Sequence, residues 1–437
     1  MTRLHAPGFP EEPIRARART GEAAAFPYWS EYGRAVFGAE PGDDLLDRMR
    51  LAPPIFMPQR LEKLIELGRE PTYADVELAT AIGGLPSRLP VYVSALGSTE
   101  VAGSVLGLAV IRQAARLGVP LVIGENVASM DGYRDTETAA GLLLRIKTYL
   151  AELRDGYGGI VVQQSTEDAD SEVWNLVYSD PAVADLLDSG RLAFELKAGQ
   201  GAKPGLGGMT VLDPADAARV AGRYVLDTTI GPGAALLRSG CPGTFTEEIL
   251  GQQVRLMRNN YPRARVWVKL PPVRDVRAAA HTAWAAGADS VTVDGGEAGT
   301  GWAPLVFLRQ VGLPLAECLR RLGPPPSCVL VSGRMWEGAR AVKCLALGAT
   351  AVGLGRAALV AADEDPENGL VSLVECLAFE MRMLISALGK YTPDRLGPED
   401  IWDPEGGWAP DVGSDPEGGP PGAGSGPDAG RGRGAGS

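Results

Sequence analysis

Two glycine-rich loops in the last third of the chain each place an arginine directly after a glycine. In VSGRMWEG Arg334 follows Gly333, and in VGLGRAAL Arg356 follows Gly355. Glycine allows backbone N–H groups to approach an anion, and the N-terminus of a following helix favours negative charge. A guanidinium can also bind a phosphate through two hydrogen bonds. One such loop alone is typical of an ordinary turn between a strand and a helix, but the two together predict a phosphate site.

A lysine and a glutamate offer a second kind of chemistry. Lys269 ends an apolar run, so its side chain is expected to point into the mouth of the fold, where an unpaired ammonium is costly to bury. It predicts either a salt bridge to Glu125 or Asp294, or a cation set against the electron-rich end of a cofactor ring. Glu125 is likewise either a lysine's partner or a base for proton transfer.

Two more glycine-rich segments are candidates for ligand contact. GQGAKPGLGG carries Lys203 beside a proline, which predicts an ordered loop with a cation. DGGEAGTGWAP contains Gly295 and Gly296, and a turn this open lets a flat ligand approach the backbone. A flexible lid is the alternative interpretation of that second segment.

The histidines and cysteines provide few candidates for catalysis or metal binding. The two histidines are His5 and His281, and the second falls within a helical pattern, where a surface or packing role is expected. Five cysteines without a CxxC pair indicate a reduced, cytoplasmic protein and neither a disulfide scaffold nor a zinc site. Cys241 is interpreted as a non-catalytic thiol, and Cys344 and Cys376 as core residues.

Alternating strands and helices must position these candidates. Nearly continuous apolar runs typical of strands occupy 91–96, 121–125, 160–164, 193–197, 266–270, 290–294, 328–332 and 351–355. Helical patterns lie between them at 101–117, 136–153, 246–260, 274–286 and 336–347. Such strands are typical of a parallel sheet covered on both faces, and eight of them close a (β/α)8 TIM barrel. An open doubly wound sheet is the alternative, but no GxGxxG surrounds Gly97 after the first strand.

The barrel fixes where the chemistry belongs, because the active site of this fold lies at the C-terminal ends of its strands. The candidates above fall at or just after those ends, together with Lys197 and Gln200. Amides, lysines and glycines without a Cys/His/Asp cluster suit a polar, planar, anionic ligand better than a metal ion.

Three segments are expected along the chain. Residues 1–86 form an N-terminal arm and a helical layer that packs on the main domain, residues 87–402 form the barrel, and residues 403–437 form an acidic tail. The tail is rich in glycine and proline and is expected to be disordered. The arm carries arginines at 15, 17 and 19; a solvated arm is favoured, and contact with an acidic partner or another subunit is the alternative.

Composition excludes several classes of protein. The chain has 437 residues, of which 45% are hydrophobic and 22% charged, as in globular proteins. A formal charge of −12 disfavours nucleic acid binding. No apolar run is long enough for a membrane span and no secretory signal is recognised, so a cytoplasmic location without membrane contact is expected.

The segment ELKAGQGAKPGLGG resembles the signature of the FMN-binding domain of glutamate synthase. The segments SALGS, VKL, DGGEAGTGWAP, SGRMWEG and LGATAVGLGRAAL match in the family's order, within roughly residues 80 to 390. The resemblance implies an FMN-binding barrel that passes electrons between the flavin and an amino or imino acid.

The resemblance also implies roles for individual residues. Ser94, Ala95 and Gly97 would lie against the isoalloxazine ring. Lys269 would lie near the N1–C2 oxygen edge of the ring and stabilise the charge gained on reduction. Gly333 with Arg334 and Gly355 with Arg356 would hold the phosphate. Lys197, Gln200 and Lys203 would line the substrate side, where a carboxylate needs cations.

The chain departs from the family's pattern in its cysteines and one substrate loop. After Leu359, where the family places iron–sulfur ligands, only Cys376 follows, so no iron–sulfur cluster is expected. Leu206 replaces the glutamate after KPG, and TTIGPGAALLRSGC replaces the next family segment. No N-terminal glutaminase domain is expected.

Together these observations predict a stand-alone FMN-dependent oxidoreductase acting on a C–N bond of an amino-acid-like substrate, in specialised metabolism. The electron partner would be a soluble nicotinamide, oxygen or another protein, and a homo-oligomer is left open. The alternatives are an enzyme of the 2-hydroxy-acid oxidase type, which uses a catalytic histidine, and a non-catalytic flavin-binding subunit.

Overall fold

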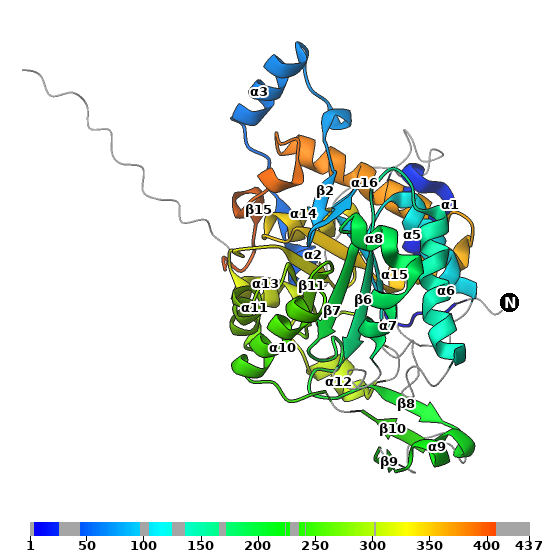
Figure 1. Ribbon diagram of the computed structural model, residues 1–437. Coiled ribbons are helices and arrows are strands. Elements are labelled where there is room, and N and C mark those ends of the chain that lie inside the picture. Colours follow the sequence, from blue (N-terminus) through cyan, green and yellow to red (C-terminus); the bar gives the residue numbers. More distant parts are fainter. Residues whose placement is uncertain are drawn as a thin grey trace, which may run out of the picture.

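Eight parallel strands close into a barrel in the order β11-β12-β13-β14-β4-β5-β6-β7 (Figure 1). The computed structural model describes residues 4–25, 44–96, 105–124, 136–165, 172–222, 224–227, 236–240, 242–300 and 303–407. The barrel strands are β4 (Val91–Leu96), β5 (Leu121–Ile123), β6 (Ile160–Ser165), β7 (Leu192–Lys197), β11 (Arg265–Leu270), β12 (Ser290–Asp294), β13 (Val329–Ser332) and β14 (Ala351–Leu354). The predicted TIM barrel is confirmed, because each of these strands lies within two residues of an expected one.

Helices separate the strands and cover the outside of the barrel. The predicted helices are α5 (Val105–Leu117), α6 (Thr136–Glu152), α10 (Glu247–Asn260), α11 (Val276–Ala285) and α14 (Gly338–Ala346). The structure adds α7 (Val173–Ser179), α8 (Ala184–Asp188), α12 (Leu305–Gln310), α13 (Leu315–Leu322), α15 (Arg356–Glu364) and α16 (Gly369–Ala387). Cys344 and Cys376 are fully buried, as expected of core residues.

A hairpin plugs the N-terminal end of the barrel. It consists of β2 (Thr80–Ile82) and β3 (Leu85–Ser87), and its Ile82 and Leu85 pack into the barrel interior. Trp267 of β11 donates a hydrogen bond of 3.0 Å from Nε1 to the Gly83 carbonyl. This end of the barrel is therefore filled by side chains.

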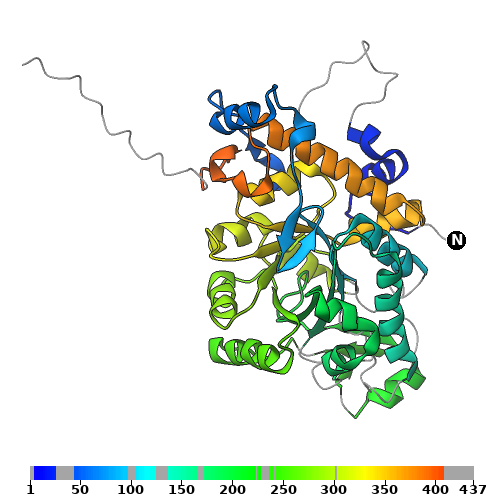
Figure 2. The same ribbon diagram turned by 45° about the horizontal axis from the view of Figure 1, so that its top comes forward.

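The N-terminal helix α1 (Glu11–Thr20) packs against α15 and α16 (Figure 2). The expected solvated arm is wrong for Arg15 and Arg17, whereas Arg19 is 41% exposed although it is paired. Arg15 is only 2% exposed and pairs with Asp363 and Glu364, while Arg17 and Arg19 pair with Glu380 and Glu364, respectively. Carboxylates of α15 and α16 within the same chain are thus the acidic partners of this arm.

Helix α3 (Pro58–Leu67) follows the predicted helical spacing but stands away from the barrel (Figure 1). None of its residues is buried, and Leu61 and Ile65 are 58% and 71% exposed. The expected packing of the N-terminal layer therefore does not hold for this helix. It does hold for α2 (Leu45–Arg48), whose Leu46 is buried.

A three-stranded antiparallel sheet follows β7 in the chain and was not predicted. Strands β8 (Met209–Leu212), β10 (Leu236–Ser239) and β9 (Leu226–Asp227) pair in that order, with α9 (Pro214–Val220) beside them. The unit projects from one end of the molecule (Figure 1). A second short pair, β1 (Arg50–Leu51) with β15 (Ile401–Trp402), joins the N-terminal part to the end of the described chain.

The remaining described elements are short 3-10 turns: η1 (Gly21–Ala25), η3 (Tyr73–Asp75), η6 (Pro181–Val183), η7 (Pro393–Arg395) and η8 (Pro398–Asp400). Within the described ranges, no helix has the length and apolar character needed to cross a membrane. The predicted disorder of the tail concerns residues that lie, from 408 onward, outside the described residues.

Candidate functional site

A cavity lies at the C-terminal ends of the barrel strands. Seven of the predicted site residues line it: Ser94, Ala95, Lys269, Gly333, Arg334, Gly355 and Arg356. They come from β4, β11 and the loops after β13 and β14. The barrel thus brings the lysine and both arginines of the phosphate loops to one cleft.

The other predicted site residues lie outside this lining or outside the described residues. Gly295 and Gly296 pack against the segment that leads into α13, where a Cβ on Gly295 would come within 2.6 Å of Leu315 Cβ. Gly97 and Glu125 belong to the ranges that the structure does not describe.

The lysines of the GQGAKPG region lie beside the cavity. Lys197 pairs in register with Lys269 on the neighbouring strand, and its Nζ donates a hydrogen bond of 3.0 Å to Gln200 Oε1. Lys203 is 3% exposed within the following loop. A Cβ on Gly201 would come within 2.4 Å of Asp294 Oδ2, so only glycine lets this loop approach the strand end so closely. Three buried lysines therefore lie on or next to the C-terminal ends of β7 and β11.

Lys269 is fixed by a carboxylate within the cavity wall. Its Nζ lies 3.0 Å from Asp294 Oδ2, and both side chains are largely buried. Asp294 Oδ1 accepts a hydrogen bond of 2.5 Å from Ser332 Oγ. Of the two salt bridges considered from the sequence, the one to Asp294 is present. This ion pair offsets the free-energy cost of burying the ammonium and fixes its position.

A second buried carboxylate belongs to Glu195 of β7, inside the barrel. Its two oxygens accept hydrogen bonds from Gln163 Nε2 at 2.5 Å and from Thr292 Oγ1 at 2.8 Å. Burial raises the pKa of Glu195, while the charge of Lys269 and the two hydrogen bonds act in the opposite direction. No motif in the sequence marks Glu195, which lies two residues before Lys197 on the same face of the strand.

The loops after β13 and β14 form the end of the cavity where a phosphate is predicted, here called the phosphate end. It is built around Arg356, at the N-terminus of α15. Its Nη2 donates a hydrogen bond of 2.7 Å to the Glu297 carbonyl, and its guanidinium lies 4.3 Å from the centre of the Phe9 ring. Burial, and then the positive charge of Arg334, lower the pKa of Arg356. Two guanidiniums that repel each other beside a helix N-terminus form a site where an anion is stabilising.

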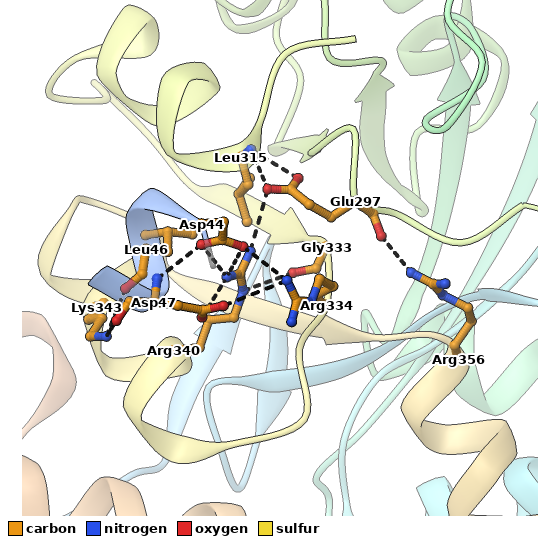
Figure 3. A network of polar contacts seen from close by, with 10 residues as sticks. All are labelled: Asp44, Leu46, Asp47, Glu297, Leu315, Gly333, Arg334, Arg340, Lys343 and Arg356. Atoms are coloured by element: carbon orange, nitrogen blue, oxygen red, sulfur yellow. Dashed lines mark hydrogen bonds and ion pairs between the residues drawn. The ribbon is translucent and has the colours of Figure 1, made fainter. Parts of the chain in front are cut away.

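Arg334 occupies a turn that few residues other than glycine adopt. Its φ is +53°, and that of the preceding Gly333 is +149°. Its Nη1 lies 3.6 Å from both Asp44 Oδ2 and Asp47 Oδ2, so residues before the barrel reach this loop (Figure 3). Such backbone strain persists where surrounding contacts fix it, and it often marks a functional loop.

The residues of the cavity fit a polar, phosphorylated ring. Among the described residues, Ser94 Oγ and Arg334 Nε are buried polar atoms of the lining that make no hydrogen bond. Buried polar groups are normally satisfied, so both call for a ligand or water. A Cβ on Gly355 would meet only Ser94 Cβ, at 3.9 Å, so this glycine faces open space that a ligand can fill.

Sequence reasoning did not select every residue of the lining, and Ser332 and Phe9 show two different reasons. Ser332 ends a predicted strand, so the rule that selects strand ends could have found it. Phe9 lies far from the barrel in sequence, and no motif marks it. Only the packing of the N-terminal segment on α15 brings it to Arg356.

Comparison with known families identifies most of the barrel. The family described as the conserved region in glutamate synthase matches residues 158–364. That range contains six of the eight barrel strands and both loops in which an arginine follows a glycine.

Three relatives illustrate the similarity. An archaeal-type glutamate synthase [NADPH] of Dehalococcoides mccartyi is 34% identical over 187 residues, which cover 40% of this chain and 36% of that protein. A glutamate synthase large subunit-like protein of Rhizobium meliloti is 38% identical over 183 residues, 40% of each chain. An archaeal glutamate synthase [NADPH] of Methanocaldococcus jannaschii is 34% identical over 178 residues, 39% of this chain and 34% of that protein. The matched part is thus less than half the length of each of these relatives.

Solved structures share the fold at low sequence identity. (S)-mandelate dehydrogenase from Pseudomonas putida superposes with a TM-score of 0.53 at 18% identity, over 91% of this chain and 99% of that one. A mutant flavocytochrome b2 with pyruvate bound gives a TM-score of 0.52 at 17% identity, over 82% and 77%. Residues 158–364 match the conserved region in glutamate synthase, which confirms the resemblance predicted from the motifs.

Proposed function

We propose that the protein is an FMN-dependent oxidoreductase that acts on a C–N bond of an amino-acid-like substrate. One observation carries the proposal: Lys269, Arg334 and Arg356 line the same cavity at the mouth of a barrel of the glutamate synthase type. A bound FMN would supply the two-electron redox chemistry that amino acid side chains lack.

The loops after β13 and β14 would hold the phosphate. Gly333 and Gly355 offer backbone close to the cavity, and the two arginines offer charge-assisted hydrogen bonds. Arg356 is oriented by the Glu297 carbonyl, which takes one of its donors and leaves the others for a ligand.

The opposite side of the cavity would act on the ring and the substrate. Lys269, held by Asp294, provides a fixed positive charge where negative charge develops on reduction. Lys197, Gln200 and Lys203 would bind the carboxylate of the substrate from the adjacent loop. Glu125 remains a proposal for proton transfer.

Neither histidine supports the 2-hydroxy-acid oxidase alternative. His281 is exposed on α11, where its ring contacts Trp284 edge-on at 5.6 Å. His5 is exposed and pairs with Glu11. Neither of them lines the cavity. Because two of the relatives above are named for NADPH, a soluble nicotinamide is the first electron partner to test.

Spectroscopy of the purified protein tests this proposal. Protein as purified, or after addition of FMN, should show the visible absorbance of bound flavin. Amino acids and nicotinamides are then added one at a time without oxygen, and bleaching identifies the electron donor. Protein that takes up no FMN would overturn the cofactor assignment. Bleaching by 2-hydroxy acids but not by amino acids would overturn the substrate class, and flavin that no donor bleaches would indicate a non-catalytic subunit.

A further inference from the structure

Two carboxylates from the N-terminal part of the chain reach the phosphate end of the barrel. Asp44 is the N-cap of the short helix α2 and Asp47 lies within it, and both contact the arginines of the loop after β13 and of α14 (Figure 3). We propose that Asp44 and Asp47 are positioning residues for the cofactor phosphate, acting through Arg340 on the turn at Gly333 and Arg334. The inference rests on the proposed FMN site and adds to it two residues from outside the family match, which begins at residue 158.

Arg340 is the link between the carboxylates and the phosphate loop. Its side chain is 1% exposed, and its Nη1 donates to Asp44 Oδ2 at 2.7 Å and to Asp47 Oδ1 at 3.0 Å. Its Nε donates to the Gly333 carbonyl at 3.1 Å. A buried guanidinium needs its anionic partners, so Asp44 and Asp47 determine where Arg340, and with it the Gly333 carbonyl, can lie.

The turn that Arg340 holds is a strained one. Gly333 and Arg334 both have positive φ, a backbone conformation that is unfavourable for a residue other than glycine. The turn presents Arg334 to the cavity, and its Nε is buried without a hydrogen-bond partner among the described residues. The hydrogen bond from Arg340 stabilises this conformation of the turn.

The carboxylates are themselves firmly placed. Asp44 caps α2 by accepting a hydrogen bond of 2.9 Å from the Asp47 N–H. Lys343 of α14 donates from Nζ to the Leu46 carbonyl at 2.7 Å. Helix α2 is thus bound to α14 through both its backbone and its side chains, so the contact with Arg340 belongs to a defined interface.

Two opposite effects on phosphate binding have to be weighed. Removing a negative charge near a phosphate strengthens the attraction between the phosphate and the arginines. Loosening Arg340, by contrast, disorders the turn at Gly333 and Arg334. Arg334 Nη1 lies 3.6 Å from each carboxylate, beyond hydrogen-bond distance, while Arg340 Nη1 lies within 2.7–3.0 Å of them. The carboxylates therefore act mainly on Arg340, and their removal is expected to weaken phosphate binding.

Comparing FMN with riboflavin isolates the phosphate, because riboflavin has the same ring without it. In flavin-free protein, dissociation constants for both ligands are measured by quenching of flavin fluorescence. Asp44→Asn should weaken FMN binding about tenfold, the effect of one charged hydrogen bond, and leave riboflavin binding unchanged. Asp47→Asn, which removes a single contact to Arg340, should weaken FMN binding about threefold.

Glu405→Gln is the matched control. It removes the carboxylate that pairs at 2.5 Å with Arg48 of α2. Because this ion pair is exposed, its loss should change neither the FMN nor the riboflavin dissociation constant. Arg340→Lys keeps the charge but loses the Nε donor, and should reproduce the FMN-selective loss even if Asp44→Asn does not fold.

Three outcomes would overturn the inference: an unchanged or tighter FMN constant in the variants, an equal loss for both ligands, or a loss in Glu405→Gln of the same size. Failure of the unchanged protein to bind FMN would instead overturn the proposed function. The two failures are therefore distinguishable.

Discussion

The two ends of the cavity are built in different ways. At the end proposed to hold the flavin ring, here called the ring end, Lys269, Asp294 and Ser332 come from the ends of neighbouring strands. The Asp294 carboxylate pairs with Lys269 and accepts a hydrogen bond from Ser332. At the phosphate end, the loops after β13 and β14 depend on contacts with Phe9, Asp44 and other residues before the barrel. The first end is a product of the barrel itself, whereas the second is assembled from distant segments.

Charge is also balanced differently at the two ends. The ammonium of Lys269 is neutralised by Asp294, which itself lines the cavity. The guanidinium of Arg340 is neutralised by Asp44 and Asp47, which do not line it. Arg334 does line the cavity, and the same two carboxylates lie 3.6 Å from it, outside the lining. At the ring end, by contrast, both members of the ion pair face the cavity, so a ligand there would meet the ammonium and the carboxylate together.

The largest expected effect separates these roles at the ring end. Lys269→Met should retain FMN, because the phosphate end is untouched, but should make the flavin harder to reduce. Removing one group that stabilises developing negative charge commonly costs about 100-fold. For a two-electron couple, a change of that size in the equilibrium constant of flavin reduction corresponds to about 60 mV in the midpoint potential. Redox titration against reference dyes measures the midpoint potential.

The control for this variant is Lys269→Met with Asp294→Asn, which leaves no unpaired buried carboxylate. It should show a lowered potential with better stability than the single variant. A midpoint potential equal to that of the unchanged protein in both variants would contradict the assigned role of Lys269.

At the phosphate end, Arg356→Ala should weaken FMN binding by about 10- to 100-fold, the range expected for loss of a charged hydrogen bond. Riboflavin binding should stay within about twofold, because riboflavin lacks the phosphate. Titration of flavin fluorescence gives both constants. Arg320→Ala, which removes an exposed arginine paired with Glu317, is the control. An equal loss of both ligands would show that Arg356 supports the fold and not the phosphate.

A smaller effect is expected from the aromatic ring that covers Arg356. Phe9→Ala removes a cation–π contact and should weaken FMN binding about threefold. Phe9→Leu keeps the apolar packing and tests whether the ring itself matters. If neither variant changes the FMN constant, the N-terminal segment merely lies beside the phosphate end.

The same contrast explains what the sequence could predict. Barrel strands are buried on both faces, so they appear as apolar runs, and the rule that the active site lies at their C-terminal ends then finds Lys269, Arg334 and Arg356. These predictions need only local pattern and the number of strands. The ring end and the two phosphate loops are therefore visible in the sequence.

Contacts between distant segments are not visible in this way. Asp44 and Arg340 are 296 positions apart, and no spacing rule relates them. The sequence predicts a solvated Arg15 because its carboxylate partner lies on α15, far away in the chain. Helix α3 has the spacing of a packed helix, although none of its residues is buried. The antiparallel sheet of β8, β10 and β9 was missed because it lies outside the alternation of strands and helices from which the barrel was predicted.

The smallest effect concerns Glu195, the buried carboxylate of the ring end. Burial raises its pKa above the ordinary value of 4.5, so the folded state favours the neutral form. The stability that this group contributes is complete below the unfolded pKa and is lost as the pH rises through the folded one. Glu195→Gln is neutral at every pH, so its melting temperature relative to the unchanged protein should rise by a few degrees, on the order of 2–4 °C, between pH 5 and pH 8.

Glu317→Gln provides the opposite case for this last measurement. Arg320 and Arg321 lower the pKa of Glu317, so it is ionised in both the folded and the unfolded state above about pH 5.5. The melting temperature of Glu317→Gln relative to the unchanged protein should therefore stay constant from about pH 5.5 to pH 8. A constant difference for Glu195→Gln as well would mean that Lys269 and the hydrogen bonds from Gln163 and Thr292 offset the burial of Glu195. The ring end would then hold a second ionised carboxylate beside Asp294, and Lys269 would contribute less net positive charge to the cavity.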